Sequence, residues 1–103
     1  IIKKVLNEYS TFDIKIKWPN DLLIKSRKVC GILQELIKVD KKNFLIIGIG
    51  INTRNSPNNK KFKSISLLEC SDKIINNYKI LKNLKKNYEL SNWRYWQYKY
   101  KNL

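Results

Sequence analysis

The fold is decided by the stretch KVCGILQELIKVDKKNFLIIGIGI, residues 28–51. Two mainly apolar segments, 28–39 and 44–51, flank the polar residues 40–43 (DKKN), a composition typical of a hairpin connection. The stretch therefore predicts two antiparallel strands joined by a short turn. Because residues 44–51 are continuously apolar, we expect this second strand to be central and buried on both faces.

The residues before this stretch predict a helix and shorter strands. Apolar side chains at helical spacing in residues 1–10 indicate the end of a helix. Residues 14–18 alternate isoleucine or tryptophan with lysine, which is typical of a half-buried strand. Pro19 should end that strand because proline cannot donate a ladder hydrogen bond. Residues 21–25 are a candidate for a short second strand.

The residues after the stretch predict a loop followed by helices. We expect residues 52–63 to form a loop and residues 65–68 a short strand or turn. Ser71 is a candidate N-cap for a helix with one apolar face. That face would hold Ile74, Tyr78, Leu81, Leu84 and Tyr88. The aromatic-rich residues 90–100 predict a last helix. The fold class is therefore α/β, with a mixed, mostly antiparallel sheet first and helices after it.

Glycines alternate with isoleucines at the end of the second predicted strand. Gly48, Gly50 and Asn52 share one face of an ideal strand, and the isoleucines at 47, 49 and 51 share the other. Such a strand presents a floor without side chains, ending in an amide that can donate and accept hydrogen bonds. This would suit a flat heterocycle such as adenine. Alternatively, the glycines relieve crowding against a helix, and the sequence leaves both interpretations open.

Polar residues beside the first strands are further candidates for chemistry. Pro19 would bend the chain after Trp18 and aim the amide of Asn20 and the carboxylate of Asp21 into a cleft, although Pro-Asn-Asp is also ordinary turn chemistry. Lys28 could neutralise charge that develops on an acyl phosphate, or it could be a solvated turn lysine.

The composition argues against several kinds of site. The formal net charge of +14 invites a nucleic-acid interface, yet only three of the 22 basic residues are arginines. Lysine, asparagine and isoleucine share AT-rich codons, so we do not expect nucleic-acid binding. Because the sequence has no histidine, it offers no Ser-His or Cys-His nucleophile, and we assign no metal ligand.

The cysteines and the apolar segments indicate the compartment. Cys30 and Cys70 are far apart and form no C-x-x-C motif, so we expect two free, buried thiols in a reducing environment. No apolar run approaches the roughly 20 residues of a membrane-spanning helix. We therefore expect a cytoplasmic protein without a membrane partner.

Three motifs occur together and in order: KWPND at 17–21, RKVCGIL at 27–33 and GIGIN at 48–52. Together they resemble the catalytic domain of the biotin–protein ligases. That family makes biotinyl-5′-adenylate from biotin and ATP, then passes biotin to a lysine of an acceptor, typically the biotin carboxyl carrier domain of acetyl-CoA carboxylase. The resemblance implies a class II aminoacyl-synthetase-like domain shared with lipoate ligases, and a need for Mg²⁺ to shield the triphosphate.

The resemblance also implies roles for single residues. Lys28 resembles the family's catalytic lysine, which contacts the biotin carboxylate and the α-phosphate. Gly31 and Ile32 resemble backbone positions that line the biotin pocket. The residues that would hold ATP or the adenylate are Asn20, Asp21, Gly48, Gly50 and Asn52. Lys28 and Gly31 have opposite parity on an ideal strand, so either a bulge lies between them or Lys28 precedes the strand.

Parts of the family pattern are missing from this sequence. No Gly- and Arg-rich loop, which in the family closes over biotin and the phosphates, precedes residue 17, and no small β-barrel follows. We therefore expect residues 1–103 to be a partial catalytic domain with little ligase activity alone, and a homodimer is a possible assembly. Two alternatives stay open: a lipoate or octanoate transferase relative, and a non-catalytic fragment that binds nucleic acid by charge.

Overall fold

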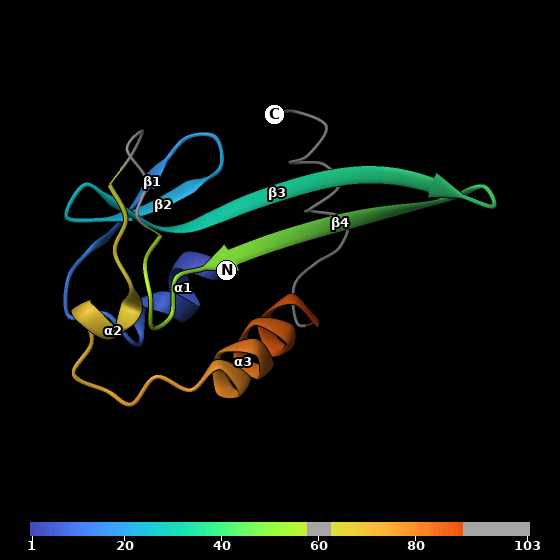
Figure 1. The fold of residues 1–103 in the computed structure, drawn as a ribbon. Coiled ribbons are helices and arrows are strands. Elements are labelled where there is room, and N and C mark those ends of the chain that lie inside the picture. Colours follow the sequence, from blue (N-terminus) through green and yellow to red (C-terminus); the bar gives the residue numbers. More distant parts are fainter. Residues whose placement is uncertain (58–62, 90–103) are drawn as a thin grey trace.

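The computed structural model describes residues 1–57 and 63–89 as a sheet with helices packed on one side of it (Figure 1). The elements follow in the order α1 (Ile2–Asn7), β1 (Ile14–Lys17), β2 (Asp21–Ile24), β3 (Arg27–Val39), β4 (Lys42–Ile51), α2 (Leu67–Cys70) and α3 (Asn77–Glu89). The α/β class, the helix at the start and the four strands are as predicted. The helix predicted over residues 90–100 lies outside the described residues.

The sheet has the order β1-β2-β3-β4, and every neighbouring pair is antiparallel. The hairpin of β3 and β4 is paired continuously from Cys30↔Ile51 to Val39↔Lys42. Its turn residues Asp40 and Lys41 have φ of 49° and 65°, as expected of a two-residue turn that follows the twist of the strands. The predicted hairpin and the mostly antiparallel sheet are therefore confirmed.

The core lies where the base of the sheet meets the helices. Fourteen apolar residues of the described part of the chain are buried there: Ile2, Val5, Leu6, Ile14, Leu22, Ile24, Val29, Cys30, Ile65, Leu67, Cys70, Ile75, Ile80 and Leu84. Both cysteines are free and buried, as expected. Within the described residues, no helix is long and apolar enough to cross a membrane. The far part of the β3–β4 hairpin, residues 35–46, contributes nothing to this core and extends beyond the helices as an arm (Figure 1).

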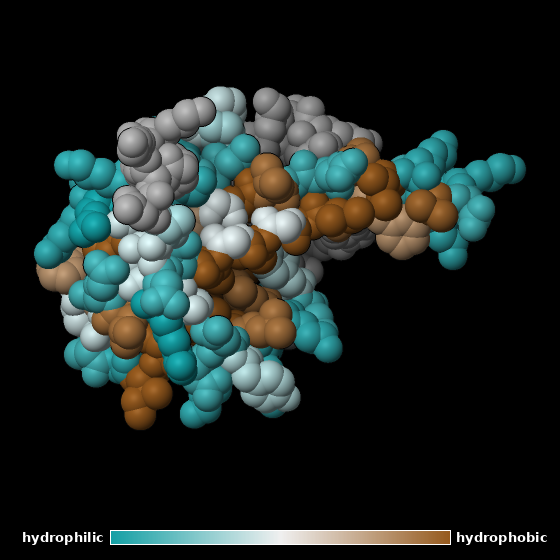
Figure 2. Space-filling view, in the orientation of Figure 1, coloured by the Kyte–Doolittle hydropathy of each residue, from teal (hydrophilic) through white to brown (hydrophobic). Residues whose placement is uncertain are grey.

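The prediction that residues 44–51 form a strand buried on both faces is wrong. Exposure alternates along β4: Phe44 and Ile46 are 46% and 48% exposed, whereas Ile49 and Ile51 are partly buried against the core. Among the described residues β4 pairs with β3 alone, and the helices cover one face of the sheet at its base. Figure 2 shows the resulting apolar surface along the arm.

The half-buried strand predicted over residues 14–18 is only partly correct. Ile14 is buried, but Ile16 and Trp18 are 64% and 73% exposed because β1 is the outer strand of the sheet. The strand ends at Lys17, and a turn with a cis Trp18–Pro19 peptide leads to β2. Pro19 therefore marks the end of the strand as predicted.

The helix predicted after Ser71 begins later. Asn76 accepts a hydrogen bond from the Lys79 amide at 3.1 Å and caps α3, whereas the Ser71 hydroxyl accepts from the Lys73 amide in a local turn. The buried face is therefore formed by Ile80 and Leu84, with Tyr88 packed beside them. The other predicted face residues are exposed: Ile74, Tyr78 and Leu81. The sequence predicts a short strand or turn over residues 65–68, but Leu67 and Leu68 begin the short helix α2 instead.

Two buried serines beside α2 give a matched test of stability. Ser66 begins a capping box in which its hydroxyl accepts from the Glu69 amide and the Glu69 carboxylate accepts from the Ser66 amide. Ser66→Ala is therefore expected to lower the free energy of unfolding by about 1 kcal/mol. Ser64 is also buried, but its hydroxyl has no partner among the described residues, so Ser64→Ala should be neutral or slightly stabilising. Urea denaturation measures both, and equal losses would contradict this assignment.

Candidate functional site

A β-bulge near the start of β3 places Lys28. The pairing between β2 and β3 shifts there: Leu22 lies opposite Cys30, but Leu23 lies opposite Lys28, so Val29 is the extra residue. A bulge reverses the alternation of side chains, which puts Lys28 on the same face of the sheet as Gly31. Of the two explanations for the parity of Lys28 and Gly31, the bulge is confirmed.

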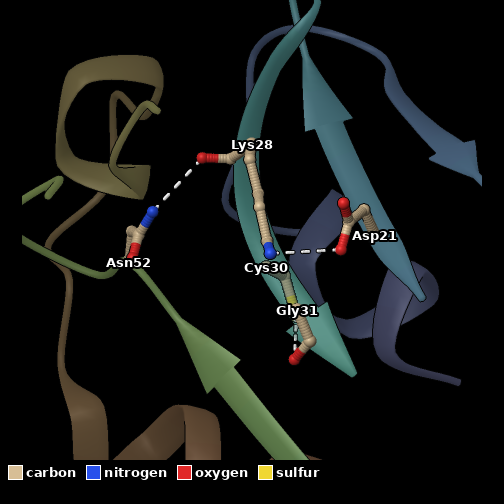
Figure 3. Close-up of polar contacts among 5 residues, drawn as sticks. All are labelled: Asp21, Lys28, Cys30, Gly31 and Asn52. Carbon is tan, nitrogen blue, oxygen red and sulfur yellow. Dashed lines mark hydrogen bonds and ion pairs between the residues drawn. The ribbon is translucent and has the colours of Figure 1, made fainter. Parts of the chain in front are cut away.

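The side chain of Lys28 lies across Gly31 and reaches Asp21 of β2 (Figure 3). Its Nζ is 3.2 Å from Asp21 Oδ1, and both side chains are about 30% exposed. A Cβ added at Gly31 would lie 3.2 Å from both Cε and Nζ of Lys28, so the glycine leaves room for this conformation. An ion pair that is partly exposed to solvent contributes only about 0–1 kcal/mol to stability, so the pair matters more for the orientation of the ammonium than for folding.

Glycines of both strands form the floor beside Lys28. Gly31 pairs with Gly50, and the next pair on this face is Leu33 with Gly48. A Cβ at Gly50 would meet the Gly31 carbonyl oxygen at 3.9 Å, and one at Gly48 would meet only Leu33, at 3.8 Å. Both are ordinary van der Waals distances to the neighbouring strand, and the helices lie on the opposite face. Among the described residues, relief of crowding against a helix therefore does not explain these glycines.

Asn52 closes the floor at the end of β4. Its side-chain nitrogen donates to the carbonyl oxygens of Lys28 and Ile65, at 3.2 and 3.3 Å. The segment 63–65 also binds the Lys28 backbone directly: the Lys28 amide donates to Lys63 O, and the Ile65 amide donates to Lys28 O, both at 2.9 Å. Nothing in the sequence indicates these long-range hydrogen bonds, which bring a third segment, residues 63–65, to the site.

The structure divides most of the predicted site residues between two cavities, and Gly48 lines neither of them. One cavity of about 300 Å³ is lined by Lys28, Gly31, Gly50 and Asn52, together with Cys30, Ile51 and Pro57. Asn20 and Ile32 instead line a smaller cavity of about 150 Å³ beside α1 and Tyr88. Asp21 borders the smaller cavity and pairs with Lys28 of the larger one. The Ile32 amide donates to Asn20 O at 2.7 Å, so a backbone hydrogen bond joins these two residues of the smaller cavity.

Cys30 lines the larger cavity, yet its thiol is not a nucleophile near neutral pH. Burial raises the pKa of Cys30 from 9.0 to about 12; the Lys28 ammonium opposes this rise and the Asp21 carboxylate adds to it. Because the thiolate is the reactive form, a thiol with this pKa stays protonated and inert. Covalent catalysis through Cys30 is therefore not part of the chemistry of this site.

The raised pKa of Cys30 predicts a loss of stability at alkaline pH. Above pH 9 the unfolded chain ionises this thiol while the folded chain keeps it protonated, so stability falls between pH 9 and about 12. Unfolding by urea from pH 8 to 11 should show a steeper decline for the native sequence than for Cys30→Ala. Cys70 and Tyr88 also have raised pKa values and titrate in both proteins. Parallel declines would contradict the assignment.

The structure is that of an α/β domain, with helices on one face of an antiparallel sheet and a lysine beside a glycine floor on the other. The family model described as the biotin/lipoate A/B protein ligase family matches residues 1–52. The chain belongs to this family, whose members are ligases. The match contains all three motifs of the sequence.

Solved and curated relatives agree with this assignment. The Aquifex aeolicus biotin protein ligase in complex with biotin and ATP superposes with a TM-score of 0.59 at 33% identity, over 87% of this chain and 41% of that one. The bifunctional ligase/repressor BirA of Bacillus subtilis is 44% identical over 54 residues, which are 52% of this chain and 17% of that protein. The biotin–[acetyl-CoA-carboxylase] ligase of Mycobacterium tuberculosis is 35% identical over 54 residues, 52% of this chain and 19% of that protein.

The chain spans less than a fifth of these two curated relatives and about two fifths of the solved structure. The sheet and helices described above are therefore a part of the ligase fold. The predicted resemblance to biotin–protein ligases and the predicted fold class are confirmed.

Proposed function

We propose that residues 1–103 are part of the catalytic domain of a biotin–protein ligase and supply its Lys28 centre. Such an enzyme joins biotin to ATP as biotinyl-5′-adenylate and transfers biotin to a lysine of an acceptor protein. The observation that carries this proposal is the placement of the Lys28 ammonium over Gly31, 3.2 Å from Asp21, beside a floor formed by Gly31 and Gly50. A fixed cation next to an uncovered backbone suits an anionic, flat ligand.

The proposed chemistry has two steps. In the first, a carboxylate oxygen of biotin attacks the α-phosphorus of ATP, a new O–P bond forms, and the bond to the β-phosphate breaks to release pyrophosphate. Lys28 stabilises the negative charge that gathers between the carboxylate and the α-phosphate. In the second, the neutral amine of the acceptor lysine attacks the acyl carbon and loses a proton to water, and AMP leaves with the electrons of the C–O bond. Lys28 can then balance the charge on the departing phosphate.

The remaining residues of the proposed site bind the adenylate or orient Lys28. Gly48 and Gly50 let the adenylate approach the backbone, and Gly31 leaves room for the lysine. Asn20 and Ile32 form part of the wall of the smaller cavity, and the backbone hydrogen bond between them fixes their positions there. Asp21 holds the Lys28 ammonium.

A magnesium ion fits the proposed site only if the phosphates of ATP supply most of its ligands. Among the described residues no group of three or more His, Cys, Asp or Glu could hold a metal ion. Mg²⁺ sites that serve nucleotides commonly use one or two carboxylates together with phosphate oxygens, and Asp21 could supply one. The ion would shield the charge of the triphosphate.

The proposed acceptor is a biotin carboxyl carrier domain of acetyl-CoA carboxylase. The name of the mycobacterial relative supports that choice. A cytoplasmic location, where ATP and such carboxylases meet, is part of the same proposal.

The second candidate function is lipoate or octanoate transfer, because the matching family model covers both kinds of ligase. A competition experiment separates the two. Non-hydrolysable analogues of biotinyl-, lipoyl- and octanoyl-adenylate are titrated into the chain by calorimetry. We expect the biotinyl analogue to bind at least about tenfold more tightly, a difference of about 1.4 kcal/mol. Tighter binding of the lipoyl or octanoyl analogue would replace the biotin proposal with the second candidate.

A further inference from the structure

The side chain of Asn52 contacts the backbone of the residue proposed as catalytic. In Figure 3 its amide nitrogen points at the Lys28 carbonyl, 3.2 Å away. The same nitrogen donates to Ile65 O at 3.3 Å. The Asn52 backbone is held as well: its amide donates to Val29 O at 2.9 Å, and its carbonyl accepts from the Leu67 amide at 2.8 Å. Asn52 therefore joins β3, β4 and the segment before α2.

Chemistry fixes the orientation of this amide. Both neighbours are carbonyl oxygens, which only accept hydrogen bonds, so the NH₂ group of Asn52 must face them. An amide nitrogen carries two N–H donors, and the two carbonyls use both. The NH₂ group of Asn52 is thus committed within the protein and is not available to a ligand in this structure.

The position that Asn52 supports is unusual in the sheet. Lys28 lies at the bulge, where the register with β2 changes, and its backbone is bound by residues 63–65 on the other side. The Lys28 carbonyl accepts from both Asn52 and Ile65. The direction of a side chain follows from its backbone. Hydrogen bonds that fix the Lys28 peptide therefore also fix the direction in which its side chain passes over Gly31 toward Asp21.

We propose that Asn52 is a positioning residue that acts through its side-chain NH₂ group on the Lys28 peptide and keeps the Lys28 ammonium over Gly31. The proposal deepens the proposed function and rests on it for its consequence in catalysis. It differs from a role for Asn52 in reading adenine, because the atom that matters donates to a carbonyl of the protein and not to the ligand.

An isosteric substitution tests the donor directly. Asn52→Asp keeps the shape and the accepting oxygen but replaces the NH₂ group with an oxygen that faces two carbonyls. The first readout needs no ligand: the nuclear Overhauser effect between the Lys28 ε-methylene and the Gly31 α-protons. We expect it in the native chain and expect its loss in Asn52→Asp. Asn43→Asp, the same change at the exposed far end of β4, is the matched control and should keep it. An unchanged effect in Asn52→Asp would overturn the proposal.

The second readout is a double-mutant cycle in the binding of the biotinyl-adenylate analogue. If Asn52 acts through Lys28, Asn52→Ala should weaken binding by up to about tenfold in the native background, and hardly at all in a Lys28→Ala background. Additive losses would show an independent ligand contact and overturn the positioning role. If the native chain does not bind the analogue, the proposed function fails, and the ligand-free measurement alone decides the role of Asn52.

Discussion

Lys28→Ala is expected to weaken binding of the biotinyl-adenylate analogue by about 10- to 100-fold. Lys28 lines the larger cavity and its ammonium is oriented by Asp21, so the substitution would remove a charge-assisted hydrogen bond to the acyl phosphate. Such bonds contribute about 1.5–3 kcal/mol, which corresponds to this range of affinities. Calorimetric titration of the native and variant chains measures the change. The fold should survive, because the Asp21–Lys28 pair is partly exposed and contributes little to stability.

Lys38→Ala is the matched control for this prediction. It removes the same charge from the same strand, but at an exposed position on the arm of the hairpin. A chain with a net charge of +14 attracts any anion to some extent, and the control measures that general effect. If both alanine variants lost affinity equally, binding would depend on overall charge, and Lys28 would be a solvated turn lysine.

Gly50→Ala is expected to weaken binding of the analogue while slightly raising the stability of the fold. Gly50 does not have a positive φ, and an added Cβ would have its nearest heavy atom 3.9 Å away, so alanine fits the fold. Glycine within a strand is destabilising by roughly 0.5–1 kcal/mol relative to alanine, so the variant should unfold at slightly higher denaturant concentration. The added methyl group would stand on the floor of the cavity and lower analogue affinity by about tenfold or more.

The two measurements on Gly50→Ala distinguish the interpretations of the glycines. Higher stability with weaker binding indicates a glycine retained for the ligand. Lower stability would mean that the glycine relieves crowding in the folded chain. Unchanged affinity for the analogue would contradict a ligand floor at Gly50, whatever happened to stability.

The β3–β4 hairpin could be predicted because its signals are local. Apolar runs flank a polar turn, and the alternation of Gly48 and Gly50 with isoleucines assigns faces once the strand is recognised. The burial of β4 could not be predicted in the same way, because exposure depends on what packs against a strand. Ile46 is as apolar as Ile49, yet it lies on the uncovered face of the arm.

The start of α3 was missed because two residues compete as caps. Ser71 and Asn76 are both good N-cap residues, and local sequence does not rank them. Ile75 decides the outcome: it is 2% exposed in the irregular segment before the helix, and its packing in the core therefore keeps the chain out of helical conformation there. Such a constraint comes from tertiary packing.

The residues of the candidate site could be predicted from the sequence, but the contacts between them could not. On an ideal strand, Lys28 and Gly31 would lie on opposite faces of the sheet. The bulge at Val29 places them on the same face, and the sequence does not show this bulge. The contact between Asn52 and the Lys28 carbonyl joins residues 24 positions apart. Because it arises from the meeting of three segments, no local pattern could indicate it.

One titration tests the location of the site most directly. The chain has three glycines, at 31, 48 and 50, and all lie on the proposed floor. Glycine amides are usually resolved in a nitrogen–proton correlation spectrum, so they report on the floor as a group. On addition of the biotinyl-adenylate analogue, we predict large shifts of the three glycine amides and of Lys28 and Asn52, with little change in the amides of α3. Shifts confined to α3 or to the arm, or no shifts at saturating ligand, would contradict the account.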